Sequence, residues 1–400
     1  MNININYYKE LGEVTVWNKR FNNIGNKYTS NTISTKNVSA AVMKSLENSG
    51  DIKLLSVGLF DGYTDCQDTS IINELEVIAI PSGGTANIKY YNGKFINSGN
   101  LLAISSNTEL YNLKYIYYYL QKHVNLIEDA FRGVSIKHPQ MKDILGIKIP
   151  ICNIDMQNKI ASILSEIDNK INSEDMFINK LKETKKSLLE LLFPSNNSNH
   201  PQLRFKDFTS PWEQRKFSEL VQIERGGSPR PIDNFITDAP NGLNWVKIGD
   251  APTQGNCITK TAEKIRPEGL SKTREVHPGD LILSNSMSFG KPYIMGIDGC
   301  IHDGWLLIRN AHGVFDLTFL CHLLGAPQML NQYKSLAAGS TVNNLNKELV
   351  GDTYVTIPSI TEQRVLGTCL EHLNHLITLH QCKLKKYKEI KSALLDKLLV

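Results

Sequence analysis

Five polar loops combine glycine or proline with serine, asparagine, lysine or arginine, a composition suited to contacts with nucleic acid. They cover residues 82–89 and 132–140 in the first half, and 225–231, 284–291 and 339–347 in the second. Cations can neutralise phosphates, while amide and guanidinium groups can read base edges. The candidate DNA contacts are therefore Thr85, Lys89, Arg132, Ser135, Lys137, Arg225, Arg230, Asn285, Lys291, Ser340, Thr341, Asn343, Asn344 and Lys347.

Any one of these loops is also compatible with an ordinary surface turn. Two of them, 132–140 and 339–347, occupy equivalent places in the two halves of the chain. That recurrence favours a binding role for these two.

Motifs for catalysis are missing from the sequence. There is no GxxxxGK[ST] loop, no strand opening into GxGxxG and no Asn/Asp-Pro-Pro-aromatic run. His372 and His375 lie three residues apart on a charged stretch without an HExxH glutamate, so they predict a solvated or partner-facing surface rather than a metal site. We expect no catalytic residue, no metal and no cofactor.

Composition predicts a reduced, cytoplasmic protein with real hydrophobic cores. Hydrophobic residues make up 41% of 400 residues, and the net charge of +4 is a mild basic bias compatible with nucleic acid. The seven cysteines are scattered and form no CxxC pair. The first residues lack the cationic start and apolar run of a signal peptide, and no apolar run is long enough for a membrane span.

The chain contains one long segment twice. Residues 149–194 and 357–400 both begin with Ile-Pro and align without a gap from Gln157 and Gln363 onward, at an offset of 206 residues. Upstream, Leu11–Val14 matches Phe217–Leu220 at the same offset. A repeat of this length predicts two modules with equivalent frames and different variable surfaces.

Each repeated segment predicts a long helix with one apolar seam. Spacings of four and three, the period of coiled-coil helices, connect Ile160, Leu164, Ile167, Ile171, Ile178, Leu181, Leu188 and Leu192, and likewise Leu366, Leu370, Leu373, Ile377, Leu384, Tyr387, Leu394 and Leu398. Glu174 and Lys185 interrupt the first seam, and His380 and Lys391 interrupt the second at matching positions. Two unrelated amphipathic helices are the alternative. The matched interruptions favour antiparallel pairing of the two helices.

The variable parts, about 7–148 and 202–356, mix strand-like and helical stretches without regular alternation. This pattern predicts α+β domains. Helical stretches are expected from Leu113 to about Ala130 and from Leu317 to Ser335, and Tyr90–Gly93 is expected to form a hairpin turn.

In order and duplication these features resemble the specificity subunit of type I restriction–modification enzymes. The resemblance covers essentially the whole chain. It rests on the two IP…Q…L…I…K…LL helices, the PQLRF…W opening of the second half, GGSPRP, HPGDLILS with the following GK, and AGSTVNNLNK before the second Ile-Pro.

The resemblance implies an α+β fold with two target recognition domains, 1–148 and 202–356. Long helices at 149–194 and 357–400 would form an antiparallel coiled coil with a pseudo-twofold internal repeat, and residues 195–201 would be a linker. It implies a non-catalytic subunit that reads a bipartite double-stranded DNA target. Two modification subunits would perform adenine methylation, and restriction subunits would perform cleavage.

The first half departs from the family pattern, because it lacks the RF…W opening and any GGxPxP loop. A recognition domain of another subclass and a shortened N-terminus both account for this. Two other functions stay open for the chain: a coiled-coil adaptor without DNA specificity, and a self-contained DNA methyltransferase or nuclease.

Overall fold

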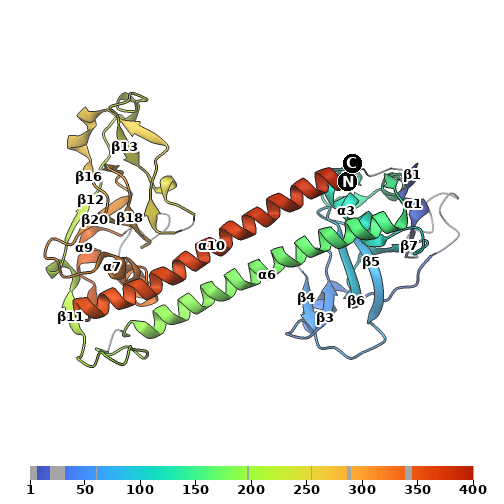
Figure 1. Cartoon of the computed structure of the whole chain (residues 1–400), viewed down its shortest axis with the longest axis horizontal. Coiled ribbons are helices and arrows are strands. Elements are labelled where there is room, and N and C mark those ends of the chain that lie inside the picture. Colours follow the sequence, from blue (N-terminus) through green and yellow to red (C-terminus); the bar gives the residue numbers. More distant parts are fainter. Residues whose placement is uncertain are drawn as a thin grey trace. The chain divides into compact units, whose positions relative to one another are not determined.

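The computed structural model describes residues 7–18, 32–59, 61–195, 198–253, 255–285, 290–337 and 345–399. The chain divides into two compact units, which we describe one at a time. The first contains Met1–Ser173 and Lys385–Val400, and the second contains Glu174–Leu384. The two long helices contribute to both units (Figure 1).

The first unit is built on a six-stranded mixed sheet. Its strand order is β2 (Thr15–Trp17), β7 (Asn100–Ser105), β5 (Asn73–Pro81), β6 (Lys89–Asn97), β3 (Ile52–Leu55) and β4 (Gly62–Thr64). Only the β3–β6 pairing is parallel among these. Successive side chains of β5 face opposite sides, so Ile78 and Ile80 join the main core while Val77 and Ala79 join a smaller cluster.

Helices cover the main-core face of this sheet. They are α3 (Leu113–Lys122), α4 (Val124–Asp129), α5 (Met141–Leu145) and the start of α6 (Ile154–Leu192), with α1 (Leu11–Val14) beside them; α2 (Ala40–Leu46) packs on a separate cluster. Two short ribbons, β1 (Tyr7–Glu10) with β10 (Lys148–Ile151) and β8 (Phe131–Arg132) with β9 (His138–Pro139), complete the unit. The predicted 113–130 helix is interrupted at His123, where α3 ends and α4 begins.

The second unit contains two larger sheets. The five-stranded sheet has the order β12 (Gln222–Arg225), β20 (Trp305–Arg309), β17 (Leu281–Ser284), β18 (Pro292–Met295) and β14 (Cys257–Ile258). The four-stranded sheet has the order β15 (Glu263–Ile265), β13 (Leu243–Val246), β19 (Gly299–Ile301) and β16 (Arg274–Val276). Leu306 and Leu307 enter different cores, so the central strand β20 is buried on both faces.

Helices α7 (Leu317–Leu324), α8 (Pro327–Ala337) and α9 (Lys347–Gly351) pack on the five-stranded sheet, together with parts of α6 and α10 (Ile360–Leu398). The 3-10 helices are η2 (Phe217–Glu219), η3 (Ile232–Asn234), η4 (Ile248–Asp250) and η5 (Pro267–Lys272). A short ribbon pairs β11 (Glu213–Lys216) with β21 (Tyr354–Ile357). Its register, Glu213 opposite Ile357, repeats Tyr7 opposite Ile151 at the 206-residue offset.

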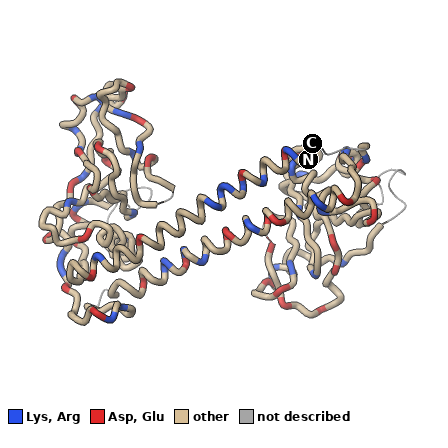
Figure 2. The backbone as a smooth tube through the Cα atoms, viewed as in Figure 1, with Lys and Arg blue, Asp and Glu red and all other residues tan. Residues whose placement is uncertain are grey.

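The long helices run antiparallel, as the sequence predicts. In the first unit the beginning of α6 lies against the end of α10, where Lys391 binds Asp168 at 2.7 Å. In the second unit the later part of α6 lies against the first part of α10, where Lys185 donates to Asn374 at 2.6 Å. These two contacts are equivalent under the offset of 206. Figure 2 shows the charged residues distributed along both helices.

The predicted hairpin turn at Tyr90–Gly93 is wrong. These residues lie inside strand β6, where Tyr91 is opposite Val77 and Gly93 is opposite Leu75. Gly93 has a φ of 136°, so glycine allows a backbone conformation here that other residues rarely adopt within a continuous strand. Among the described residues, no helix is long and apolar enough to cross a membrane.

Candidate nucleic-acid interface

A pair of glycines brings the 225–231 loop against the rest of the second unit. The Gly226 N–H donates to Trp305 O at 2.9 Å, and the Gly227 N–H donates to Ile301 O at 3.1 Å. A Cβ on Gly226 would lie 2.2 Å from His302 O, and one on Gly227 would lie 2.3 Å from Lys272 O. Only glycine allows this approach, which explains the GG of the GGSPRP motif.

The loop converges on Asp303, in the turn between β19 and β20. Arg225 Nε donates to Asp303 O at 3.3 Å and Ser228 Oγ to Asp303 Oδ1 at 3.1 Å. Arg230 Nη2 lies 3.6 Å from Asp303 Oδ2, and its side chain is 80% exposed. Both predicted arginines therefore flank a single carboxylate residue at the surface.

The other two predicted loops of the second unit meet at the same turn. Buried Asn285 donates its side-chain amide to Asp303 O at 2.9 Å, and its backbone N–H donates to Gly304 O at 3.0 Å. Its carbonyl accepts the Leu345 N–H at 3.0 Å. The segments that contain Arg230, Asn285 and Lys347 are thus joined, although Asn285 itself fixes the turn instead of facing solvent.

The remaining candidates of the second unit differ in surroundings. Lys347 is exposed and lies 3.7 Å from the carboxylate of Glu348. Lys291 is exposed, with its ammonium 5.0 Å from the centre of the Tyr293 ring. Ser340, Thr341, Asn343 and Asn344 lie outside the described residues.

In the first unit, the structure brings the two predicted loops together. The Gly84 N–H donates to Lys137 O at 2.8 Å, and His138 Nδ1 lies 2.9 Å from Ser82 O. Thr85, Ser135 and Lys137 line a solvent-open hollow of about 470 Å³ between the loops. Hydroxyl groups and a cation therefore gather at one place, as expected of a surface that contacts nucleic acid.

Two candidates of the first unit have partners within the protein. Lys89 forms an ion pair with Asp61 and donates to Ser56 O at 2.9 Å, and its side chain is mostly buried. Arg132 is exposed and binds Asp143 at 2.8 Å. Lys89 thus stabilises its own domain, whereas Arg132 is accessible.

Sequence reasoning did not identify Asp303 as part of the site, because its role arises from contacts between distant segments. It also missed two buried groups that hold the repeated frame. Gln157 and Gln363, at 0% and 1% exposure, each accept a backbone N–H at 2.9 Å, from Asn112 and Asp316. Each also donates to two carbonyls, those of Leu110 and Cys152 in one half and Val314 and Pro358 in the other.

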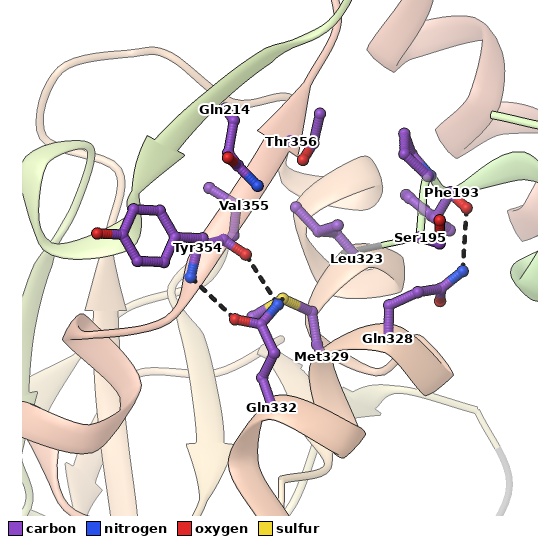
Figure 3. Close-up of a pocket in the computed structure, with 11 residues that line it drawn as sticks. Phe193, Ser195, Gln214, Leu323, Gln328, Met329, Gln332, Tyr354, Val355 and Thr356 are labelled. Carbon is purple, nitrogen blue, oxygen red and sulfur yellow. Dashed lines mark hydrogen bonds between the residues drawn. The ribbon is translucent and has the colours of Figure 1, made fainter. Parts of the chain in front are cut away.

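A pocket of about 300 Å³ lies elsewhere in the second unit, between the end of α6, α8 and β21 (Figure 3). Gln328 donates to Phe193 O at 3.0 Å, while Gln332 exchanges two hydrogen bonds with the Tyr354 backbone. None of the predicted DNA contacts lines this pocket. Among the described residues, no group of three or more His, Cys, Asp or Glu side chains is arranged to hold a metal.

The chain belongs to the family described as the type I restriction modification DNA specificity domain, whose model matches it twice, over residues 19–183 and 209–391. The type I restriction enzyme MjaVIII specificity subunit of Methanocaldococcus jannaschii is 23% identical over 341 residues, covering 82% of this chain and 79% of the relative. The putative MjaX specificity subunit of the same organism is 22% identical, covering 78% of this chain and 74% of the relative.

Solved structures have the same fold. The crystal structure of the type I restriction-modification system S subunit from M. genitalium matches with a TM-score of 0.70 at 16% identity, covering 100% of this chain and 98% of that one. A structure titled for complex assembly and conformational transition of the type I R-M system matches with a TM-score of 0.55 at 16% identity, covering 100% and 99%. Two α+β domains and two antiparallel long helices are therefore the fold that this chain shares with these structures.

Proposed function

We propose that this chain is the DNA-reading, non-catalytic specificity subunit of a type I restriction–modification complex. The observation that carries the proposal is the double match to the specificity-domain family, with one match in each half of the chain. It is accompanied by a structural frame that repeats at an offset of 206 residues. The convergence of the predicted loops on one surface of each unit supports it.

In this proposal, residues 1–148 and 202–356 are two target recognition domains that read the two halves of a bipartite double-stranded site. Residues 149–194 and 357–400 are the spacer helices, and 195–201 is the linker. Among the candidate contacts, Arg225, Arg230, Arg132 and Lys137 are exposed cations suited to DNA.

The partners in this proposal are two modification subunits, which carry adenine methylation, and restriction subunits, which carry cleavage. Each half of the chain offers an equivalent helix end and strand ribbon to one modification subunit. A buried glutamine fixes the start of the helix in the same way in both halves. The complex acts in the cytoplasm, where its DNA substrate is.

The test is to map methylated adenines in a genome exposed to the complex of this chain with its modification subunits. The proposal expects one bipartite motif with a fixed unread spacer, which disappears when the chain is omitted. A complex that binds DNA without sequence preference, or protein only, would identify an adaptor. Methyl transfer by the isolated chain would identify a self-contained enzyme.

A further inference from the structure

Asp303 is the point at which the DNA-facing segments of the second recognition domain meet. Its carboxylate lies beside Ser228 Oγ (3.1 Å), Arg230 Nη2 (3.6 Å) and His302 Nδ1 (2.9 Å). Its backbone carbonyl accepts from Arg225 Nε and the Asn285 amide.

The two carboxylate oxygens have different surroundings. Oδ1 is near Ser228 and His302, which belong to the loop and to the turn itself. Oδ2 faces the Arg230 guanidinium, whose other nitrogens are free to point outward because the side chain is 80% exposed. A carboxylate on one edge of a guanidinium limits its rotation while leaving donors for a base or a phosphate.

A carboxylate on a DNA-facing surface repels phosphates, so the surface gains affinity if it is removed. At 30% exposure, the Asp303 side chain is only partly removed from solvent. A role in orienting the exposed Arg230 explains why a carboxylate is placed on this surface. An arginine held in one direction can distinguish guanine, whereas a freely rotating one contacts phosphates without regard to sequence.

We infer that Asp303 is a positioning residue for sequence reading. It holds the 225–231 loop and orients the Arg230 side chain of that loop toward one base pair of the half-site that residues 202–356 read. This inference rests on the proposed function. Asp303 does not need to touch DNA itself. Its effect therefore depends on the presence of Arg230.

The experiment uses the full chain assembled with its modification subunits. Binding is measured to the cognate site and to a set of sites that each change one base pair in either half. D303N should lower the preference for the cognate base pair at one position by roughly tenfold, the scale of one specific arginine contact. Discrimination in the other half should be unchanged, and non-specific binding should not weaken, because a negative charge is lost.

R230A and the double variant R230A/D303N decide whether the two residues act together. R230A should lose discrimination at the same position, and adding D303N should cause no further loss. D298N is the matched control, since Asp298 is an exposed carboxylate of the same domain that binds His277 at 2.8 Å. It removes the same charge and should leave discrimination at every position as in the wild type.

Effects that multiply in the double variant would overturn the inference, as would an equal loss at all positions in D303N. If D303N does not assemble, the variant S228A is tested instead, because it removes only the hydroxyl group that contacts Asp303 Oδ1. Reduced discrimination at the base pair that depends on Arg230 supports the inference. Unchanged discrimination at that base pair overturns it. A wild-type complex that discriminates at no position would instead contradict the proposed function.

Discussion

At the scale of single residues, Glu362 explains why the second half opens with PQLRF and Trp212. The carboxylate, in a side chain only 2% exposed, accepts from Arg204 Nε and Nη2 at 2.8 Å each and from Trp212 Nε1 at 3.2 Å. The opening segment of the domain is thereby attached to the first turn of α10. A bidentate arginine is the appropriate partner, because a buried carboxylate without one is costly.

We expect R204A to lower the free energy of unfolding by about 3 kcal/mol, because it leaves the Glu362 carboxylate buried and unpaired. Urea denaturation of the chain measures this. R215A is the matched control: Arg215 is an exposed arginine that binds Glu213 and Glu219, and its removal should cost less than about 1 kcal/mol. The double variant R204A/E362Q should recover part of the loss. Equal costs for R204A and R215A would contradict this account.

At the scale of elements, the interrupted seams of α6 and α10 define the pairing of the helices. Glu174 and His380, which occupy equivalent positions in the repeat, contact each other at 2.7 Å, and Lys383 also binds Glu174. A contact between equivalent residues is what a repeat with internal twofold pairing produces. Polar residues within an apolar seam specify register in coiled coils.

The contacts of Glu174 with His380 and Lys383 predict that the free energy of unfolding depends on pH. Hydrogen bonds from Lys383 and His380 hold the pKa of the Glu174 carboxyl below its ordinary value of 4.5. The unfolded state therefore binds the proton more readily, so this stabilisation is present above about pH 4.5 and is lost as the pH falls through the folded-state pKa. We expect E174Q to reduce the difference in unfolding free energy between pH 7 and acidic pH.

Urea denaturation at a series of pH values checks this. The control is E183Q, at an exposed position of the same helix. It should keep the wild-type pH profile. A wild-type profile in E174Q would show that the ion pair does not contribute to the pH dependence.

The long helices could be predicted from sequence because their period and polar interruptions repeat at a fixed offset. Ile160, Leu164, Leu366 and Leu370 are buried in the structure as the seam requires. The site was harder to predict. Asn285 has the residue type and loop position of a DNA contact, yet it is buried, because its side-chain amide donates to Asp303 O. The charge of Lys89 predicts a DNA contact, but Asp61, 28 residues earlier in the chain, forms an ion pair with it.

At the scale of the whole molecule, duplication of the frame has a consequence for assembly. The ribbons, the caps at Asn153 and Ser359 and the buried glutamines recur at an offset of 206 residues. The surfaces of the variable parts, about 7–148 and 202–356, do not recur at this offset. Equivalent frames favour identical partners, and different surfaces favour different DNA half-sites.

We therefore expect two modification subunits to bind each chain at saturation, and the chain alone to transfer no methyl group. Native mass spectrometry of the purified complex gives the ratio. A single bound modification subunit at saturating concentration would mean that the two frames are not equivalent for binding.

The substitution Q363A tests the repeated frame of the second half directly. Loss of the buried Gln363 amide should weaken binding of the modification subunit to the second half of the chain more than binding to the first half.

The most direct test of the account replaces residues 202–356 with the equivalent domain of a related specificity subunit that has a different target, and maps the methylated sites. We predict that one half of the bipartite motif changes to that of the donor, while the other half and the spacer length stay the same. If both halves change together, the two domains do not read DNA independently, and the division into two recognition domains is wrong.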